Sequence, residues 1–270
     1  MSNHQNFAKL NGVSLAYRDI GSGLPIVFIH GHAFNQSMWD PQISALSSKY
    51  RIITFDLRGY GASEVPAVES TTLETMAADI NALLDHLGIA KAVVAGLSMG
   101  GQIAMAFAEL YPQRLIALVL AATFSEIDSP EVAAARRTTA DRFINEGSAI
   151  PGGEMLTKLL AHRSIKRDPA LAVAVYTMIA LTPPAGAAAA LRGRSRRKDY
   201  TPGLKDIAVP TIVFGGTEDA YTSVETITRM QQAIPNSQLR IFDGIGHMPN
   251  LEAPDQFNKE LTVFLSALAI

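Results

Sequence analysis

The sequence predicts an α/β fold in which helices cover both faces of a mostly parallel sheet. Short apolar runs of the kind found in buried strands alternate along the chain with segments whose apolar residues recur at helical spacing. This alternation is typical of parallel sheets with crossover helices. In addition, 48% of the 270 residues are hydrophobic, which is enough for one large core.

The predicted elements follow in order along the chain. A hairpin over residues 7–18 comes first, because Asn11-Gly12 is a typical two-residue hairpin turn. Strands are then predicted at residues 25–30, 52–56, 91–97, 115–122, 211–215 and 238–242. Helices are predicted at residues 41–50, 72–87, 99–111 and 224–234, and from Pro254 onward. We therefore expect residues 1–122 and 211–270 to form the core domain.

Residues 123–210 interrupt this alternation and are longer than a crossover needs. Between residues 123 and 200, 12 lysines and arginines against 8 aspartates and glutamates give +4, whereas the whole chain carries −2. We expect this segment to be a helical cap, with its return linker, over the strand ends. Its uncharged stretch 170–191 predicts two short, buried helices split at Pro183-Pro184 rather than a membrane span. A basic run is expected to form a solvated surface: Arg192, Arg194, Arg196, Arg197 and Lys198.

Composition argues against several classes of function. The chain has no cysteine, so a disulfide framework, a thiolate metal site and a cysteine nucleophile are excluded. Its small net charge without long runs of one sign argues against a nucleic-acid partner. Residues 1–9 lack the apolar stretch of a secretory signal, so a cytoplasmic location is expected. The sequence indicates no membrane partner, and it does not indicate the oligomeric state.

A glycine-flanked serine is the most informative motif in the chain. Gly96-Leu97-Ser98-Met99-Gly100 follows a predicted strand and precedes a predicted helix, which is the context of a nucleophile elbow. Glycines are needed there because the turn is tight. We therefore expect Ser98 to be a catalytic nucleophile.

A serine nucleophile needs a histidine base that a carboxylate orients. After an elbow serine the order is expected to be acid and then histidine. His247 fits, because it follows the last predicted strand in a glycine-rich loop at the same sheet edge. Glu218 and Asp219 follow the preceding strand, and both are candidates for the acid.

Two main-chain N–H groups are candidates for an oxyanion hole. Met99 follows the nucleophile at a helix N-terminus, and His32 follows a predicted strand in the segment His30-Gly31-His32. The side chain of His32 is also a candidate for the pocket. Metal binding by His30 and His32 is the alternative, but no third ligand stands nearby in a metal-binding pattern. We therefore expect no metal and no organic cofactor.

Five motifs together resemble the α/β-hydrolase fold family, in its form with a helical cap, over nearly the whole chain. They are His30-Gly31-His32, Asp56-Leu57-Arg58-Gly59-Tyr60-Gly61-Ala62-Ser63, Gly96-Leu97-Ser98-Met99-Gly100, Gly216-Thr217-Glu218-Asp219 and Gly246-His247. The fourth matches the family's G-x-x-D pattern, so the resemblance implies Asp219 as the acid. Glu126 or Asp128 is the alternative, at the position where some relatives place it. Serine at position 98 implies acyl transfer, because haloalkane dehalogenase-like and epoxide hydrolase-like relatives use aspartate there.

The chain most resembles small bacterial hydrolases that include 3-oxoadipate enol-lactonases, arylesterases and cofactor-free haloperoxidases or perhydrolases. This resemblance implies hydrolysis of an ester or lactone of a small, largely apolar molecule through an acyl-enzyme. Alternatives are C–C bond hydrolysis or perhydrolysis with the same triad, or a receptor with low turnover. An apolar set of residues is expected to line the pocket: Phe34, Phe124, Phe143, Met155, Tyr176 and Met178.

Overall fold

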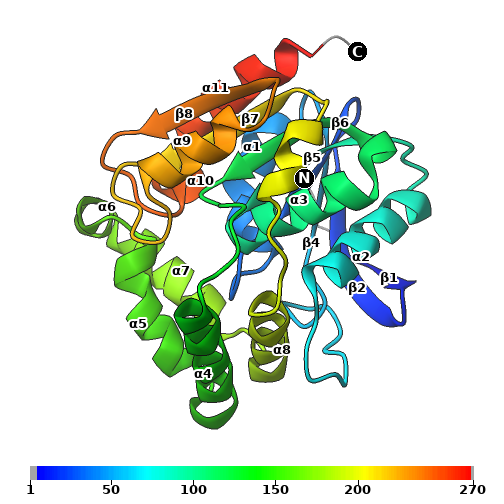
Figure 1. The fold of residues 1–270 in the computed structure, drawn as a ribbon. Coiled ribbons are helices and arrows are strands. Elements are labelled where there is room, and N and C mark those ends of the chain that lie inside the picture. Colours follow the sequence, from blue (N-terminus) through cyan, green and yellow to red (C-terminus); the bar gives the residue numbers. More distant parts are fainter. Residues whose placement is uncertain (1–4, 269–270) are drawn as a thin grey trace.

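The computed structural model describes residues 5–268 and contains one eight-stranded sheet with helices on both faces (Figure 1). The strands are β1 (Asn6–Leu10), β2 (Val13–Ile20), β3 (Pro25–Ile29), β4 (Arg51–Phe55), β5 (Ala92–Leu97), β6 (Leu115–Ala121), β7 (Thr211–Gly216) and β8 (Ser237–Phe242). Their spatial order is β1-β2-β4-β3-β5-β6-β7-β8. Pairs β1–β2 and β2–β4 are antiparallel, and the other pairs are parallel. The predicted strands and the mostly parallel sheet are confirmed.

The helices come in two groups. Those of the core are α1 (Asp40–Leu46), α2 (Leu73–His86), α3 (Met99–Leu110), α9 (Val224–Gln232), α10 (Pro249–Glu252) and α11 (Pro254–Ser266). Those between β6 and β7, which we call the cap helices, are α4 (Pro130–Glu146), α5 (Ala149–Leu159), α6 (His162–Arg167), α7 (Pro169–Ala180) and α8 (Pro184–Arg194). Three short 3-10 helices are η1 (Gln36–Trp39), η2 (Pro112–Arg114) and η3 (Thr201–Asp206).

Two hydrophobic clusters lie on the opposite faces of the sheet, because successive strand residues point to opposite sides. Val27 and Ile53 belong to the cluster under α2, α3 and α9. Phe28 and Ile52, their neighbours in sequence, belong to the cluster under α1 and α11. This two-sided burial explains why the central strands are continuous apolar runs rather than alternating ones.

The predicted hairpin turn is present, and side chains cap two of the helices. Asn11 and Gly12 both have positive φ, +47° and +81°, which is the conformation of a type I′ hairpin turn. Thr72 caps α2 by accepting a hydrogen bond from the main-chain N–H of Thr75. Ser129 caps α4 in the same way, with Val132 as the donor.

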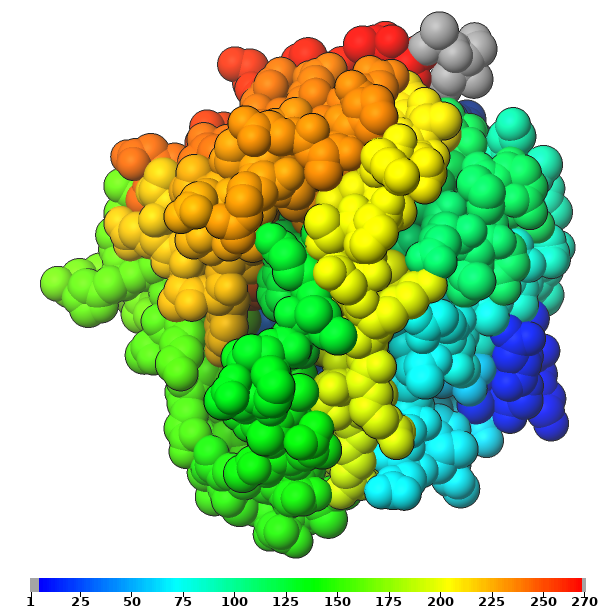
Figure 2. Space-filling model, viewed as in Figure 1, coloured from blue at the N-terminus to red at the C-terminus, as the bar shows by residue number. Residues whose placement is uncertain are grey.

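The cap helices gather on one side of the core, and α4 and α8 pack against each other there (Figures 1 and 2). Helices α7 and α8 meet at the proline pair at an angle of 87°. Of the expected two buried helices, α8 is mostly buried, but α7 has an exposed outer face. No single helix within residues 5–268 is long and apolar enough to span a bilayer; α7 and α8 meet that criterion only as a bent pair.

Candidate active site

Ser98 lies in the sharp turn between β5 and α3, with φ of 56° and ψ of −117°. A positive φ is costly for a residue with a side chain, typically about 1–3 kcal/mol, and is found mainly at functional sites. A Cβ on Gly96 would lie 2.1 Å from the carbonyl oxygen of Gly100, and one on Gly100 would lie 2.3 Å from that of Ile29. Backbone contact on both sides therefore requires the two glycines of the motif.

His247 and Asp219 lie in the loops after β8 and β7, and their side chains are in contact. Nδ1 of His247 is 2.9 and 3.0 Å from the two carboxylate oxygens of Asp219. The side chains are only 4% and 1% exposed. Oδ1 of Asp219 also accepts hydrogen bonds from the main-chain N–H groups of Tyr221 and Thr222. Because the carboxylate accepts, Nδ1 of His247 carries a proton, and Nε2 has no hydrogen-bond partner in the described residues.

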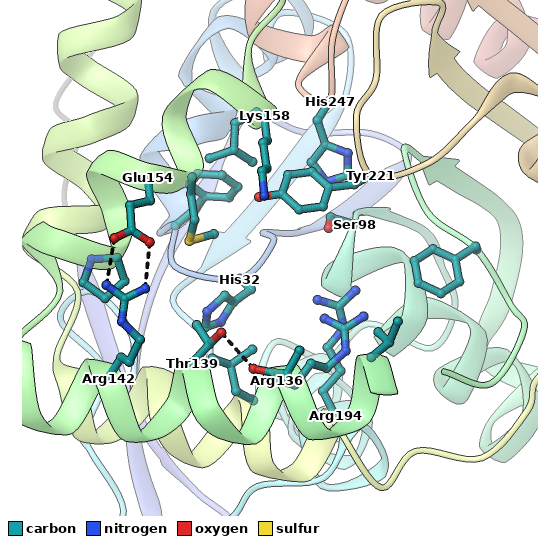
Figure 3. Close-up of a pocket in the computed structure, with 18 residues that line it drawn as sticks. His32, Ser98, Arg136, Thr139, Arg142, Glu154, Lys158, Arg194, Tyr221 and His247 are labelled. Atoms are coloured by element: carbon teal, nitrogen blue, oxygen red, sulfur yellow. Dashed lines mark hydrogen bonds and ion pairs between the residues drawn. The ribbon is translucent and has the colours of Figure 1, made fainter. Parts of the chain in front are cut away.

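Ser98 and His247 line one cavity of about 370 Å³, which the side chain of His32 also lines (Figure 3). No hydrogen bond joins Ser98 Oγ to His247 Nε2 in the structure of residues 5–268. Catalytic hydrogen bonds are often long without substrate and tighten when it binds. The residues Ser98 and His247 thus line one cavity, and the carboxylate of Asp219 contacts the imidazole of His247.

The two main-chain N–H groups expected in the oxyanion hole belong to Met99, which follows Ser98, and to His32, which lines the same cavity as Ser98. Met99 is the first residue of α3, where the N–H has no intrahelical acceptor. His32 lies in the loop after β3. Within the described part of the chain, neither N–H donates a hydrogen bond.

The other carboxylates considered as the acid are engaged elsewhere. Glu126 accepts a hydrogen bond from Arg229, and Asp128 pairs with Arg136 and Arg197. Glu218 is exposed, and it contributes its main-chain N–H to a hydrogen bond with the carbonyl of Ile245. Among these candidates only Asp219 contacts His247.

The nitrogens of His30 are both occupied by the backbone. Nδ1 lies 2.8 Å from the carbonyl oxygen of Gly31 and donates to it, while Nε2 accepts from the N–H of Leu57 at 3.0 Å. Burial lowers the pKa of His30, so the ring stays neutral. Because neither nitrogen is available, His30 cannot be a ligand in the alternative metal site. No group of three or more potential metal-binding side chains occurs in residues 5–268.

Half of the residues expected to line the pocket do so. Phe34, Phe124 and Met155 line the cavity. The prediction was wrong for the other three: Phe143, Tyr176 and Met178. Phe143 is fully buried beneath the lining with its ring against that of His32, 5.5 Å between centroids. Tyr176 is 36% exposed on α7, and the sulfur of Met178 contacts Ser37 outside the cavity. How each cap helix is rotated about its own axis determines which of its side chains line the cavity.

The cavity is also less apolar than the sequence suggested. Its lining includes five charged side chains from the cap helices: Arg136, Arg142, Glu154, Lys158 and Arg194. Arg142 is neutralised by ion pairs with Glu146 and Glu154. Figure 3 shows Arg136 and Arg194 pointing toward Ser98 from the side of the cavity opposite His247. The apolar residues expected in the lining therefore share it with charged ones.

The basic run 192–198 is not a solvated surface throughout, as the sequence had suggested. Arg194 is 7% exposed and Arg197 is 5% exposed. A Cβ on Gly186 would clash with Gly59, and one on Gly193 with Thr71, so α8 lies directly against the core backbone. This close packing carries the last turn of α8 into the interior. Burial and the like charges of Arg136 and Arg197 lower the pKa of Arg194.

Besides these charged lining residues, sequence reasoning missed Tyr221 and Glu252. Tyr221 lines the cavity with its ring 5.0 Å from that of His247, and its place two residues after Asp219 was the only available signal. Glu252 is 2% exposed, and its carboxylate accepts three main-chain N–H groups, from Gly246, Met248 and Ala161. It therefore ties the loop of His247 to the cap. No pattern in the sequence distinguishes such a buried glutamate.

Comparisons with known proteins agree with this geometry. A 3-oxoadipate enol-lactonase of Acinetobacter baylyi is 30% identical over 90% of this chain and 89% of its own. A putative non-heme bromoperoxidase of Mycobacterium tuberculosis is 30% identical over 95% of this chain and 99% of its own. The structure of a thermophilic esterase of Thermogutta terrifontis, with malate bound, superposes with a TM-score of 0.95 at 34% identity, covering 99% of this chain and all of that one. The family model of the alpha/beta hydrolase fold matches residues 25–254, and the chain belongs to that family.

Proposed function

We propose that the protein is a serine hydrolase that cleaves a carboxylic ester or lactone through an acyl-enzyme, with a triad of Ser98, His247 and Asp219. One observation carries the proposal. Ser98 stands in a strained elbow and opens into the same cavity as His247, whose other nitrogen is held by the buried Asp219. A structural role would not require this combination of strain, burial and exposure to one cavity.

The first half of the proposed reaction acylates the enzyme. His247 Nε2 takes the proton of Ser98 as Oγ attacks the carbonyl carbon. The main-chain N–H groups of His32 and Met99 stabilise the negative oxygen of the tetrahedral intermediate, and each such donor is typically worth about 10²–10³ in rate. The protonated His247 then gives its proton to the leaving alkoxide, and the C–O bond breaks.

The second half releases the acid. Water attacks the acyl carbon and gives a proton to His247, and Ser98 Oγ leaves and takes that proton back. Asp219 keeps its negative charge throughout and stabilises the imidazolium. The cap helices cover the cavity, and we propose that residues 123–210 act as a cap that selects the substrate.

The relatives support this class of reaction, since the names of two similar proteins specify an enol-lactonase and an esterase. Perhydrolysis is a second candidate, because the mycobacterial relative is named a bromoperoxidase. In that reaction hydrogen peroxide would replace water in the second half and release a peracid.

The test is covalent labelling by a fluorophosphonate, with hydrolysis of 4-nitrophenyl acetate and butyrate measured in parallel. The wild-type protein is compared with Ser98→Ala and with a control, Ser195→Ala, whose hydroxyl bonds the carbonyl of Arg192 outside the cavity. We expect label and turnover in the wild type and control, and neither in Ser98→Ala.

Each other outcome is informative. An unlabelled wild-type protein would refute the proposal, because Ser98 would then not be an activated nucleophile. Labelling without turnover of any ester would favour a receptor with low turnover. Bromide oxidation in the presence of peroxide and acetate, lost in Ser98→Ala, would favour perhydrolysis.

A further inference from the structure

Arg194 is a buried cation without a carboxylate partner, and it lines the cavity of Ser98. Nε of its side chain donates to the amide oxygen of Gln102 at 2.7 Å, and this is the one hydrogen bond that the side chain makes in the described structure. Its two terminal nitrogens therefore have no acceptor within residues 5–268. An unpaired buried charge is costly, so buried arginines are nearly always paired. This exception needs an explanation.

The charges around Arg194 do not balance. Arg136 and Arg197 are its nearest basic neighbours, and both already share one acid, Asp128. Asp128 bonds Nε and Nη2 of Arg136 at 2.6 and 3.0 Å, which leaves Nη1 of Arg136 without a partner in the described residues. Three guanidinium groups thus face a single carboxylate, and this end of the cavity has a surplus of two positive charges.

His32 supplies a further donor to the same cavity. Its Nε2 is buried without a partner, and its Nδ1 lies 2.8 Å from the hydroxyl of Tyr60. Burial raises the pKa of Tyr60, and the hydroxyl proton has no other acceptor in the described structure. Tyr60 therefore donates to Nδ1. Burial, Arg194 and Arg136 lower the pKa of His32 well below its usual range, so the ring is neutral and its one proton lies on Nε2.

This end of the cavity thus contains hydrogen-bond donors and excess positive charge, and no carboxylate of the described residues pairs with Arg194. We propose that Arg194, with Arg136 and His32, binds a carboxylate of the substrate, and that the protein hydrolyses an ester or lactone bearing a second, ionised carboxyl group. A carboxylate fits because its two oxygens match the two terminal nitrogens of one guanidinium. This inference rests on the proposed serine hydrolase. It replaces the largely apolar substrate expected from the sequence with one that carries a negative charge.

The test compares two substrates that differ only at the end remote from the ester. Methyl pentanoate ends in a methyl group, and monomethyl glutarate has a carboxylate in its place. Release of methanol gives kcat/KM for each. Charged hydrogen bonds of this kind change affinity by roughly 10- to 100-fold. We expect the wild type to prefer the glutarate ester, and the ratio of the two kcat/KM values to fall by about that factor in Arg194→Met.

Two further variants separate the binding site from net charge. Arg192→Met removes the same charge from the same helix, but Arg192 pairs with Asp141 outside the cavity lining. Its ratio should equal that of the wild type. Arg194→Lys keeps the charge and should retain part of the preference. An Arg194→Met ratio equal to that of the wild type would overturn the inference.

If Arg194→Met does not fold, a measurement on the wild type tests the proposed carboxylate site instead. Glutarate should inhibit hydrolysis of 4-nitrophenyl acetate at least about tenfold more strongly than glutaramide, its neutral analogue. Equal inhibition would overturn the carboxylate site while the serine hydrolase stands. Absence of both fluorophosphonate labelling and ester turnover would instead overturn the proposed function, and this inference with it.

Discussion

Replacing Glu252 by glutamine tests whether one buried carboxylate holds the loop of His247 in place. Oε2 accepts the N–H groups of Ala161 and Gly246 at 2.9 and 3.1 Å, and Oε1 accepts that of Met248 at 3.1 Å. A glutamine keeps the shape but offers one oxygen. It is expected to place that oxygen where two N–H groups converge and to turn its NH₂ group toward Met248.

The cost follows from those contacts. One charge-assisted hydrogen bond becomes a contact between two donors, and the other two bonds lose the charge of the acceptor. Hydrogen bonds to charged groups contribute about 1.5–3 kcal/mol each, so we expect the free energy of unfolding to fall by about 2–3 kcal/mol. For a chain of this size that corresponds to a decrease in Tm of roughly 4–12 °C.

Thermal unfolding followed by circular dichroism measures this change, and the rate of fluorophosphonate labelling reports on His247. Glu260→Gln is the matched control, because Glu260 lies on α11 and pairs with the partly exposed Arg240. Exposed pairs contribute about 0–1 kcal/mol, so its Tm should change little. If Glu252→Gln unfolds at the same temperature as Glu260→Gln, then Glu252 does not secure the loop.

Three other changes test the site and its setting. Asp219→Asn should lower kcat by about 10⁴-fold, because the amide would no longer fix Nδ1–H on His247; near-normal esterase kinetics would exclude Asp219 as the acid. Gly100→Ala should prevent stable folding, since its Cβ would lie 2.3 Å from the carbonyl oxygen of Ile29, whereas Gly203→Ala meets nothing within 4 Å and should fold normally; equal Tm values would contradict this. Lowering the pH from about 6.5 to 5.5 should destabilise the protein, because the folded-state pKa values of His30 and His32 are depressed and only the unfolded chain takes up their protons. The stabilisation from the two neutral rings is thus fully present above the pKa of histidine in the unfolded chain. Below that pKa, each histidine lowers the folding equilibrium constant by up to about tenfold per pH unit. Denaturant unfolding at several pH values measures this, and a flat profile in that range would contradict neutral, buried rings.

The parts of the protein that follow from local sequence rules were predictable. Asn11-Gly12 specifies its turn through φ preference, and the apolar runs specify buried strands, so the sheet was predicted with small errors at the strand ends. The positions of Ser98, Asp219 and His247 follow from the same logic. Each lies in the loop or turn that follows a strand, and parallel strands end at one edge of the sheet.

The cap helices were not predictable to the same depth. Their helical character and the break at the proline pair are local properties, but the direction in which each side chain points depends on how the helix is rotated. Phe143 and Tyr176 were therefore placed in the lining when one lies beneath it and the other faces outward. Glu252 was missed for a related reason, since its three donors come from segments that meet only in the folded chain.

Arg194 shows what the structure adds to a run of basic residues. In the sequence its guanidinium is indistinguishable from that of Arg192 or Arg196, and solvation is the ordinary expectation for all three. In the structure Arg192 pairs with Asp141 and Arg196 contacts Ser70, whereas Arg194 is buried with no acid in contact. Burial of a charge is tolerated when something compensates it. The two guanidinium groups nearest to Arg194, those of Arg136 and Arg197, already share the carboxylate of Asp128. The unpaired guanidinium of Arg194 lines the same cavity as Ser98. A carboxylate of the substrate would therefore compensate its charge, and this explains why the protein keeps the arginine buried.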